Sequence, residues 1–173
     1  MEEGEIVVSV VVPAFNEEQA VGLVLDDIIT VMTPLGIPYE LIVVDDGSTD
    51  QTRAICEARP QVTVISHPHN RGNGAARTTG VKAARGRYII MTDADGTYPI
   101  SAFPQMIEEL SHCDMVIGAR EREMGTLKWL RSLAKEFIKA LASYMTQTKI
   151  PDLNSGLRAM KKELVLEFLP ILP

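Results

Sequence analysis

Short runs of β-branched and other apolar residues alternate along the chain with segments whose apolar residues recur at helical spacing. Such runs are typical of buried strands, and the longer periodic segments are typical of amphipathic helices. We expect strands over residues 6–12, 39–44, 62–66, 88–92, 115–118 and 157–160, and helices over residues 16–32, 50–58, 74–84, 102–111, 127–146 and from 162 onward. This alternation predicts an α/β fold with a mostly parallel central sheet and helices on both faces.

Polar residues follow the expected strands at their carboxyl ends. We expect Pro13 to end the first strand and Asn16 to cap the next helix, with Glu17 favourable in its first turn. Asp50 is expected to cap the second helix. The polar strand ends are Asn16 and Glu17, Asp45 and Asp46, residues 70–74, Asp93 and Asp95, and Arg120. Ligands of parallel sheets bind beyond these ends, so this pattern predicts a ligand site.

The fourth strand end carries two carboxylates, Asp93 and Asp95, separated by Ala94 and followed by a glycine. Side chains repeat every second residue along a strand, so both carboxylates are expected on one side. Two carboxylates this close repel each other unless a cation lies between them, and Mg²⁺ and Mn²⁺ prefer such oxygen ligands. An Asp-Gly turn that closes the strand is the alternative. The neighbouring polar strand ends favour the metal site.

A glycine cluster over residues 72–80 follows the third expected strand. It lacks the Gly-x-Gly-x-x-Gly of a dinucleotide-binding turn, which normally follows the first strand, and the chain has no P-loop motif. Both enzyme classes are therefore disfavoured. The cluster still offers free N–H groups and a positive dipole end to an anion. A helix start that needs small residues for close packing is the alternative.

The composition is that of a globular domain, with 46% hydrophobic and 23% charged residues in 173. The net charge of −6 argues against a nucleic-acid partner. Cys56 and Cys113 lack metal-ligand spacing, which favours reduced thiols in a cytosolic environment. We expect the histidines to be ordinary loop or helix-end residues and assign them no metal role; they are His67, His69 and His112. The acidic N-terminal residues do not resemble a secretory signal, and no stretch reaches the ~20 apolar residues of a membrane span. The last residues, 168–173, are apolar. We expect a single catalytic domain over residues 1–173, truncated at its C-terminus.

Six short motifs stand in order along the chain. They are PAFNE at 13–17, VDDGSTD at 44–50, NRGNGAARTTG at 70–80, TDAD at 92–95, GAR at 118–120 and DLNSGLR at 152–158. In this order they resemble glycosyltransferase family 2, and its closest branch is the polyprenyl-phosphate hexosyltransferases typified by dolichol-phosphate mannose synthase. The resemblance extends from Val8 to Met160. It implies the A-type fold of nucleotide-diphospho-sugar transferases and the transfer of a hexose.

The resemblance also implies roles for individual residues. The residues that would bind the nucleotide-sugar are Pro13, Phe15, Glu17, Asp45, Asp46, Gly74, Asp93 and Ala94. Phe15 takes the place of a frequent Tyr and would keep its stacking, while Asp46 or its neighbour would accept a hydrogen bond from the base or ribose. Asp93 and Asp95 would hold Mg²⁺ or Mn²⁺ against the donor diphosphate. Thr97 replaces a frequent further metal ligand.

The residues that would carry the transfer itself are Asp95, Arg120, Arg131 and Arg158. Arg158 would neutralise the leaving diphosphate, a task suited to a planar, permanently charged group. A lipid phosphate acceptor is already ionised and needs cations, such as Arg120 and Arg131, rather than a general base. A sugar hydroxyl would need a further carboxylate, and the sequence has no second acidic cluster and no Gln-x-x-Arg-Trp motif.

We therefore expect a metal-dependent inverting glycosyltransferase that moves a hexose from a nucleotide-sugar of the GDP-mannose or UDP-glucose type to a polyprenyl (dolichyl) phosphate. Transfer to a water-soluble hydroxyl acceptor and non-catalytic binding of a nucleotide-sugar are the alternatives. Residues 127–146 combine an apolar face with a stripe of lysine and arginine, which is typical of a helix on anionic lipid. An ordinary surface helix is equally compatible with this pattern. Peripheral membrane contact through 127–146 at the cytosolic face is the expected location.

Overall fold

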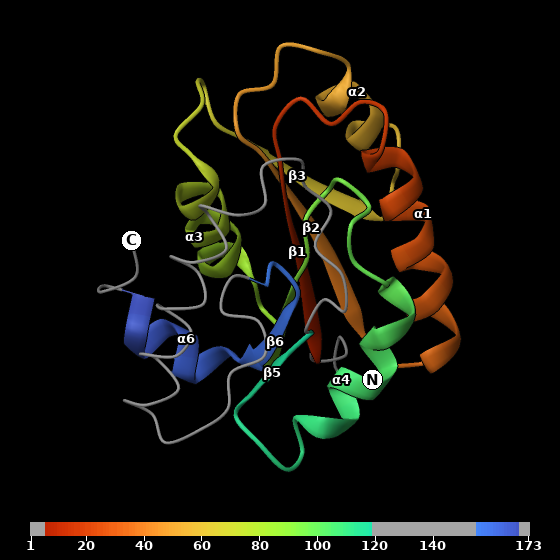
Figure 1. The fold of residues 1–173 in the computed structure, drawn as a ribbon, viewed down its shortest axis with the longest axis vertical. Helices are drawn as coiled ribbons and strands as arrows, with labels where there is room; N and C mark the ends of the chain where they lie inside the picture. The colour runs from red at the N-terminus through yellow and green to blue at the C-terminus, as the bar shows by residue number, and fades with distance from the viewer. Residues whose placement is uncertain (1–5, 119–154, 170–173) are drawn as a thin grey trace, which may run out of the picture.

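The computed structural model describes residues 6–118 and 155–169 of the chain (Figure 1). The strands are β1 (Val8–Ala14), β2 (Tyr39–Asp45), β3 (Val62–Ser66), β4 (Tyr88–Met91), β5 (Met115–Ile117) and β6 (Arg158–Lys161). The α-helices are α1 (Val21–Met32), α2 (Thr52–Glu57), α3 (Asn73–Ala83), α4 (Phe103–Glu109) and α6 (Lys162–Phe168). Short 3-10 helices cover Thr33–Leu35 and Ile100–Ala102.

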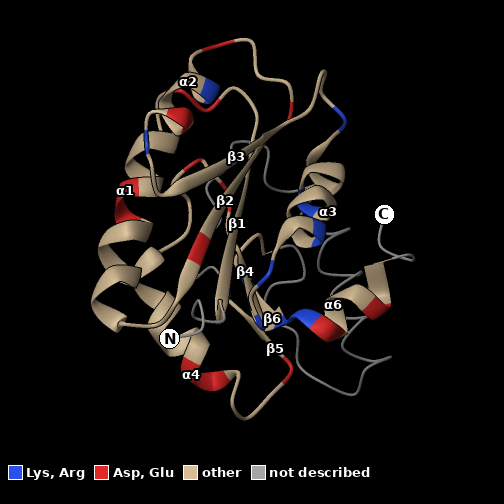
Figure 2. Ribbon diagram, turned by 180° about the vertical axis from the view of Figure 1, so that it is seen from behind, with Lys and Arg blue, Asp and Glu red and all other residues tan. Residues whose placement is uncertain are grey.

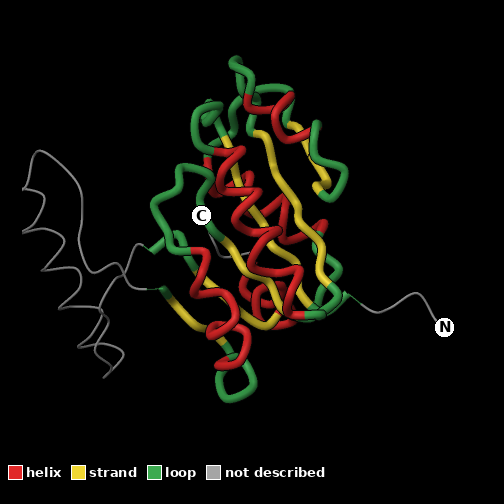
Figure 3. The backbone as a smooth tube through the Cα atoms, turned by 90° about the vertical axis from the view of Figure 1, so that its right-hand side faces the viewer, coloured by secondary structure: helices red, strands yellow, loops and turns green. Residues whose placement is uncertain are grey.

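The strands form one six-stranded sheet in the order β3-β2-β1-β4-β6-β5. β1 to β4 are mutually parallel, and β6 runs antiparallel to both of its neighbours. Helices α1, α2 and α4 cover one face of the sheet, and α3 and α6 cover the other (Figures 1 and 3). The predicted mostly parallel sheet with helices on both faces is confirmed.

The central strand β1 is buried along its whole length because helices cover both of its faces. Its even-numbered residues, such as Val10 and Val12, pack with α1 and α4, whereas Val11 packs with α3. The polar side chain of Ser9 is also buried, and its hydroxyl donates to Glu40 Oε1 while accepting from Gly86 N. The apolar layers on the two faces of the sheet hold β1, and with it the carboxyl end of this strand, in a fixed position.

The prediction that Pro13 ends the first strand is wrong, because β1 continues through Ala14. The carbonyl of Val11 accepts a hydrogen bond from Thr92 N, so odd-numbered residues of β1 direct their backbone polar groups toward β4. The pairing of β1 with β4 stops at Val11 and Met91. The missing N–H of Pro13 therefore faces a point where the neighbouring strand has already ended, and proline is tolerated there.

The prediction that Asn16 caps a helix over residues 16–32 is also wrong, because α1 begins at Val21. Asn16 has a φ of 55°, in the left-handed region, and cannot continue a right-handed helix there. The carbonyl of Glu17 accepts hydrogen bonds from Ala20 N at 3.1 Å and Val21 N at 2.9 Å, which closes a turn before the helix. Asn16 instead contacts the loop that follows β2.

The other boundaries lie close to those predicted. α2 begins at Thr52, and Asp50 Oδ1 accepts a hydrogen bond from Thr52 N at 2.9 Å, although Gln51 is the boundary residue. The predicted interfacial helix over 127–146 lies outside the described residues. Among residues 6–118 and 155–169, no helix has the length and apolar character needed to cross a bilayer.

Charged residues are distributed unevenly over the two helical layers. Figure 2 shows acidic residues on α1 and α4, where the sequence has Asp26, Asp27, Glu108 and Glu109. The charged residues of α3 are Arg77 and Lys82, both basic. Helix α3 therefore supplies positive charge, and its Arg77 lies beside Asp93 at the carboxyl end of β4.

Candidate nucleotide-sugar site

A pocket of about 300 Å³ opens at the carboxyl ends of the parallel strands. Its lining comes from four chain segments: Pro13, Ala14, Phe15 and Glu17 at β1, Asp46 after β2, Asn70, Asn73 and Ala76 at the start of α3, and Asp93, Ala94 and Asp95 after β4. The structure thus brings together around one cavity most of the residues expected to bind a donor and both residues expected to bind a metal ion.

One wall of the pocket is held by hydrogen bonds between the loops that follow β1 and β2. Asn16 Oδ1 accepts a hydrogen bond from Thr49 N at 2.8 Å, and Asn16 N donates to Ser48 Oγ at 3.0 Å. Glu17 N donates to Thr52 Oγ1 at 2.7 Å. This locked segment includes Phe15, whose ring remains 40% exposed although it is a large apolar residue. An aromatic face held at the rim of a pocket is suited to stacking on a planar ligand.

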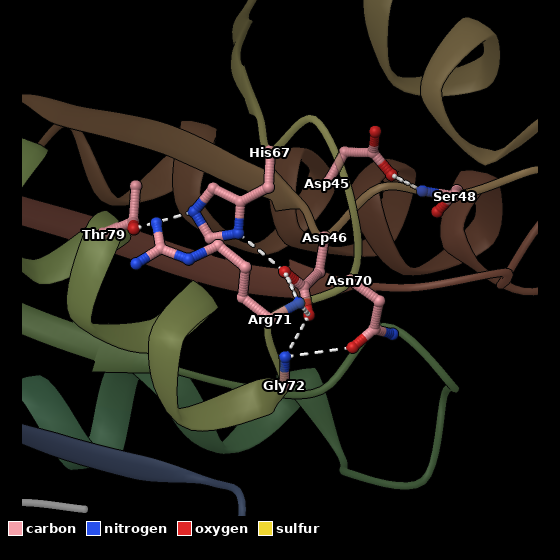
Figure 4. A network of polar contacts seen from close by, with 8 residues as sticks. All are labelled: Asp45, Asp46, Ser48, His67, Asn70, Arg71, Gly72 and Thr79. Atoms are coloured by element: carbon pink, nitrogen blue, oxygen red, sulfur yellow. Dashed lines mark hydrogen bonds and ion pairs between the residues drawn. The ribbon is translucent and has the colours of Figure 1, made fainter.

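The two aspartates after β2 have different surroundings, although both are buried (Figure 4). Asp45 Oδ1 accepts a hydrogen bond from Ser48 N at 3.1 Å, and Asp45 does not line the pocket. Asp46 lines the pocket, and its carboxylate accepts hydrogen bonds from Arg71 N, Gly72 N and His67. The Asp46 carboxylate therefore organises the loop before α3, a role that its strand-end position did not predict.

The two carboxylates of the Asp93-Ala-Asp95 motif also differ in their contacts. Asp93 Oδ1 is paired with Arg77 Nη2 at 2.7 Å, and the Asp93 side chain is 27% exposed. Asp95 is exposed, and its Oδ1 accepts a hydrogen bond from Thr97 N at 2.9 Å. Asp95 thus closes a turn after β4, as the alternative interpretation expected. Both aspartates also line the pocket.

The electrostatics of the pocket fit a divalent cation. Burial raises the pKa of Glu17, and the negative charges of Asp95, Asp50 and Asp93 raise it further. A carboxyl group whose pKa is raised by its neighbours reports a surplus of negative charge. Mg²⁺ and Mn²⁺ suit such a set of carboxylate oxygens. Among the described residues, no three His, Cys, Asp or Glu side chains form a complete metal-binding group.

The back of this motif is packed against the segment that begins at Ser155. A Cβ atom added to Gly156 would lie 2.1 Å from Asp93 Oδ2 and 2.9 Å from the ring of Tyr98. The Tyr98 hydroxyl accepts a hydrogen bond from Gly156 N. The Ser155 hydroxyl donates to the carbonyl of Gly118. Only a residue without a side chain fits at position 156, so the glycine of the DLNSGLR motif has a direct packing reason.

The remaining predicted residues lie elsewhere. Gly74 and Arg158 line a neighbouring, more apolar cavity of about 590 Å³, which also contains Asn73 and Arg77. Arg158 Nε donates to the carbonyl of Ser155 at 2.9 Å. Asn73 lines both cavities, so they adjoin at the start of α3. Arg120 and Arg131 lie outside the described residues.

Sequence reasoning missed two side chains of the site. Arg77 forms the ion pair with Asp93, and His67 is buried against Asp46. Both could have been found from position, because His67 directly follows β3 and Arg77 is three residues after Gly74, on the first turns of α3. The expectation that His67 is an ordinary loop residue is wrong with respect to its burial.

Comparisons with known proteins identify the family of this chain. The family model described as glycosyl transferase family 2 matches residues 9–169. A dodecaprenyl-phosphate galacturonate synthase from Rhizobium johnstonii is 32% identical over 166 residues, which cover 91% of this chain and 48% of that protein. The chain spans about half the length of the curated relatives that it matches.

Solved structures of glycosyltransferases have a similar fold. Glucosyl-3-phosphoglycerate synthase from Mycobacterium tuberculosis, in complex with phosphoglyceric acid, is 28% identical with a TM-score of 0.71 over 92% of this chain and 58% of that chain. A mannosyltransferase from Pyrobaculum calidifontis, in complex with GDP-Man and Mn²⁺, is 25% identical with a TM-score of 0.67 over 93% of this chain and 46% of that chain. The chain has the A-type glycosyltransferase fold and belongs to glycosyltransferase family 2.

Proposed function

We propose that this chain is the donor-binding part of a metal-dependent inverting glycosyltransferase that moves a hexose from a nucleotide-sugar to a polyprenyl phosphate. The observation that carries the proposal is the pocket in which Phe15, Asp46, Asp93 and Asp95 converge from separate strand ends. Its volume of about 300 Å³ is at the lower end of the range for small-molecule sites. An aromatic rim on one side and paired carboxylates on the other match the two ends of a nucleoside diphosphate.

Donor binding follows from this arrangement. Phe15 stacks on the base. Because hydrogen bonds already hold the loop that carries Phe15, little conformational entropy is lost when the ligand binds. Asp93 and Asp95 are the carboxylates that would hold Mg²⁺ or Mn²⁺. When bound, the cation would supply positive charge to stabilise the departing nucleoside diphosphate. Arg77 adds a guanidinium beside Asp93 and therefore lies within reach of the same anionic group.

We assign acceptor binding to basic side chains. An ionised lipid phosphate needs no general base, so the requirement is for cations that hold it in line with the anomeric carbon. Arg120 and Arg131 are proposed for this role from the sequence, and Arg158 for neutralising the diphosphate. The similarity to a dodecaprenyl-phosphate galacturonate synthase from Rhizobium johnstonii supports a polyprenyl acceptor. Such an acceptor places the reaction at a membrane surface, which we propose is the cytosolic one.

A second candidate is transfer to the hydroxyl of a small water-soluble acceptor. It is favoured by the similarity to glucosyl-3-phosphoglycerate synthase, which has been solved in complex with phosphoglyceric acid. The two candidates share the donor pocket and the metal ion. They differ only in the acceptor, so the product decides between them.

The test combines binding with product analysis. Calorimetry of the chain with UDP or GDP is expected to show binding that requires Mn²⁺ and is lost with a chelator. Incubation with labelled UDP-glucose or GDP-mannose, Mn²⁺ and polyprenyl phosphate is expected to move label into the organic phase. Label that appears in a new water-soluble product when phosphoglyceric acid replaces the lipid would favour the second candidate. Absence of Mn²⁺-dependent binding of either nucleotide would contradict both.

A further inference from the structure

His67 is buried beside the candidate donor pocket, at the point where β3 ends (Figure 4). Its Nδ1 lies 2.6 Å from Asp46 Oδ1, and its Nε2 lies 2.9 Å from Thr79 Oγ1 on α3. The exposed fractions of the two side chains are 6% for His67 and 4% for Asp46. Contacts at both ring nitrogens fix the orientation of the imidazole.

The environment of Asp46 sets the direction of its hydrogen bond with His67. Burial raises the pKa of Asp46, but hydrogen bonds from His67, Arg71 N and Gly72 N outweigh burial and hold the pKa below its ordinary value. Asp46 is therefore ionised at neutral pH and can only accept hydrogen bonds. His67 Nδ1 therefore donates to the Asp46 carboxylate, and Nε2 shares a hydrogen bond with the Thr79 hydroxyl.

The same carboxylate holds the loop that precedes α3. Asp46 accepts hydrogen bonds from Gly72 N at 2.8 Å and from Arg71 N at 3.0 and 3.1 Å. These two residues lie between Asn70 and Asn73, whose side chains line the pocket. The position of this pocket wall therefore depends on where the Asp46 carboxylate points, and that depends on His67.

We propose that His67 is a positioning residue for donor binding, which acts through Asp46 to hold the backbone of Arg71 and Gly72 in the geometry that binds the nucleotide. The inference rests on the proposed function, since its ligand is the nucleoside diphosphate of the donor. Without the imidazole, a buried oxygen of Asp46 lacks one of its partners, and the carboxylate turns toward other donors or water. The loop then occupies its binding geometry for only a fraction of the time, and the apparent affinity falls by that fraction.

The test is calorimetry of UDP and GDP with Mn²⁺ on single variants. His67→Ala is expected to weaken binding about tenfold, as when the competent loop is populated about one tenth of the time. His67→Asn keeps an N–H donor near the position of Nδ1 and is expected to remain within about threefold of the wild type. The matched control is His69→Ala, an exposed histidine in the same loop, which should leave affinity unchanged. If His67→Ala does not fold, His67→Gln removes the same donor position while keeping bulk in the site.

Amide hydrogen exchange separates positioning from a general loss of stability. The amides of Arg71 and Gly72 should exchange faster in His67→Ala without nucleotide, while amides of β1 remain protected as in the wild type. Unchanged affinity, or weaker affinity with unchanged exchange at residues 71 and 72, would overturn the proposal. Failure of His67→Asn to restore affinity would also count against it. If the wild type itself binds neither nucleotide, the proposed function fails instead, and that result is distinct from any difference between variants.

Discussion

Replacement of Gly156 by alanine gives the sharpest test of how the proposed metal-binding motif, Asp93-Ala-Asp95, is supported. The added Cβ would lie 2.1 Å from Asp93 Oδ2 and 2.7 Å from its Cγ, far inside van der Waals contact. The Asp93 carboxylate cannot retreat freely, because its other oxygen is paired with Arg77 at 2.7 Å. Overpacking of this kind costs about 1–3 kcal/mol in free energy of unfolding. For a chain of this size, a loss of 1 kcal/mol corresponds to about 2–4 °C in Tm.

The assay measures Tm and the Mn²⁺-dependent affinity for UDP or GDP in the same preparation of Gly156→Ala. We expect both to fall, because the substitution displaces a proposed metal ligand while it strains the packing. Gly22→Ala is a matched control, because its Cβ would meet the flexible end of Arg59 at 3.1 Å and a methyl group of Ile55 at 3.4 Å. Alanine also favours the helix more than glycine does. If Gly156→Ala has the Tm and the affinity of the wild type, Gly156 does not lie as close to Asp93 as the structure shows.

Three further predictions concern the proposed metal ligand, acid stability and the core. Asp95→Asn should lower Mn²⁺-dependent affinity for UDP or GDP at least about tenfold with Tm unchanged, because one of two proposed carboxylate ligands is lost. The control is Asp27→Asn, on the exposed side of α1, which should bind the nucleotides as the wild type does. Burial raises the pKa of Glu40, but the hydrogen bonds that Glu40 accepts outweigh burial and lower this pKa. The stabilisation by the ionised Glu40 is therefore fully present above the ordinary glutamate pKa and is lost as the pH falls through the lowered pKa. The free energy of unfolding, measured with denaturant between pH 7 and 3, should therefore fall less steeply with pH in Glu40→Gln than in the wild type. Equal slopes would show that Glu40 does not contribute to acid destabilisation. Leu25→Ala should cost about 2–5 kcal/mol in free energy of unfolding, because Leu25 is fully buried. Leu23→Ala, 71% exposed in the same helix, should change it by less than about 0.5 kcal/mol, and a similar loss in both would contradict the burial.

The order of strands and helices could be predicted from the sequence because each strand is a short apolar run and each helix is periodic. The errors fall where a local rule was overridden by a neighbour. Pro13 stays in a central strand because β4 has already ended beside it, which no pattern in the first strand reveals. Asn16 resembles a helix cap but serves as an acceptor for Thr49, a residue far along the chain. Both misses arise from contacts between segments, which local signals do not encode.

The candidate site was partly predictable for a related reason. The residues after each strand had to meet, because parallel strands place their carboxyl ends at one edge of the sheet. What each side chain does there depends on contacts across the fold. Asp46 was expected to face a ligand, yet its oxygens are largely occupied by loop amides and His67. The pairing of Asp93 with Arg77 likewise required the packing of α3 against the sheet.

The hydrogen bonds that join Gly118 to the segment after residue 154 have a consequence for how this family can diversify. Gly118 N donates to Leu157 O at 3.0 Å, and the Ser155 hydroxyl donates to the carbonyl of Gly118, so the chain leaves and re-enters the sheet at neighbouring points. A connection whose two ends are held together can change in length at little entropic cost to the folded body. Changes between residues 118 and 155 can therefore occur without disturbing the strand ends that line the pocket.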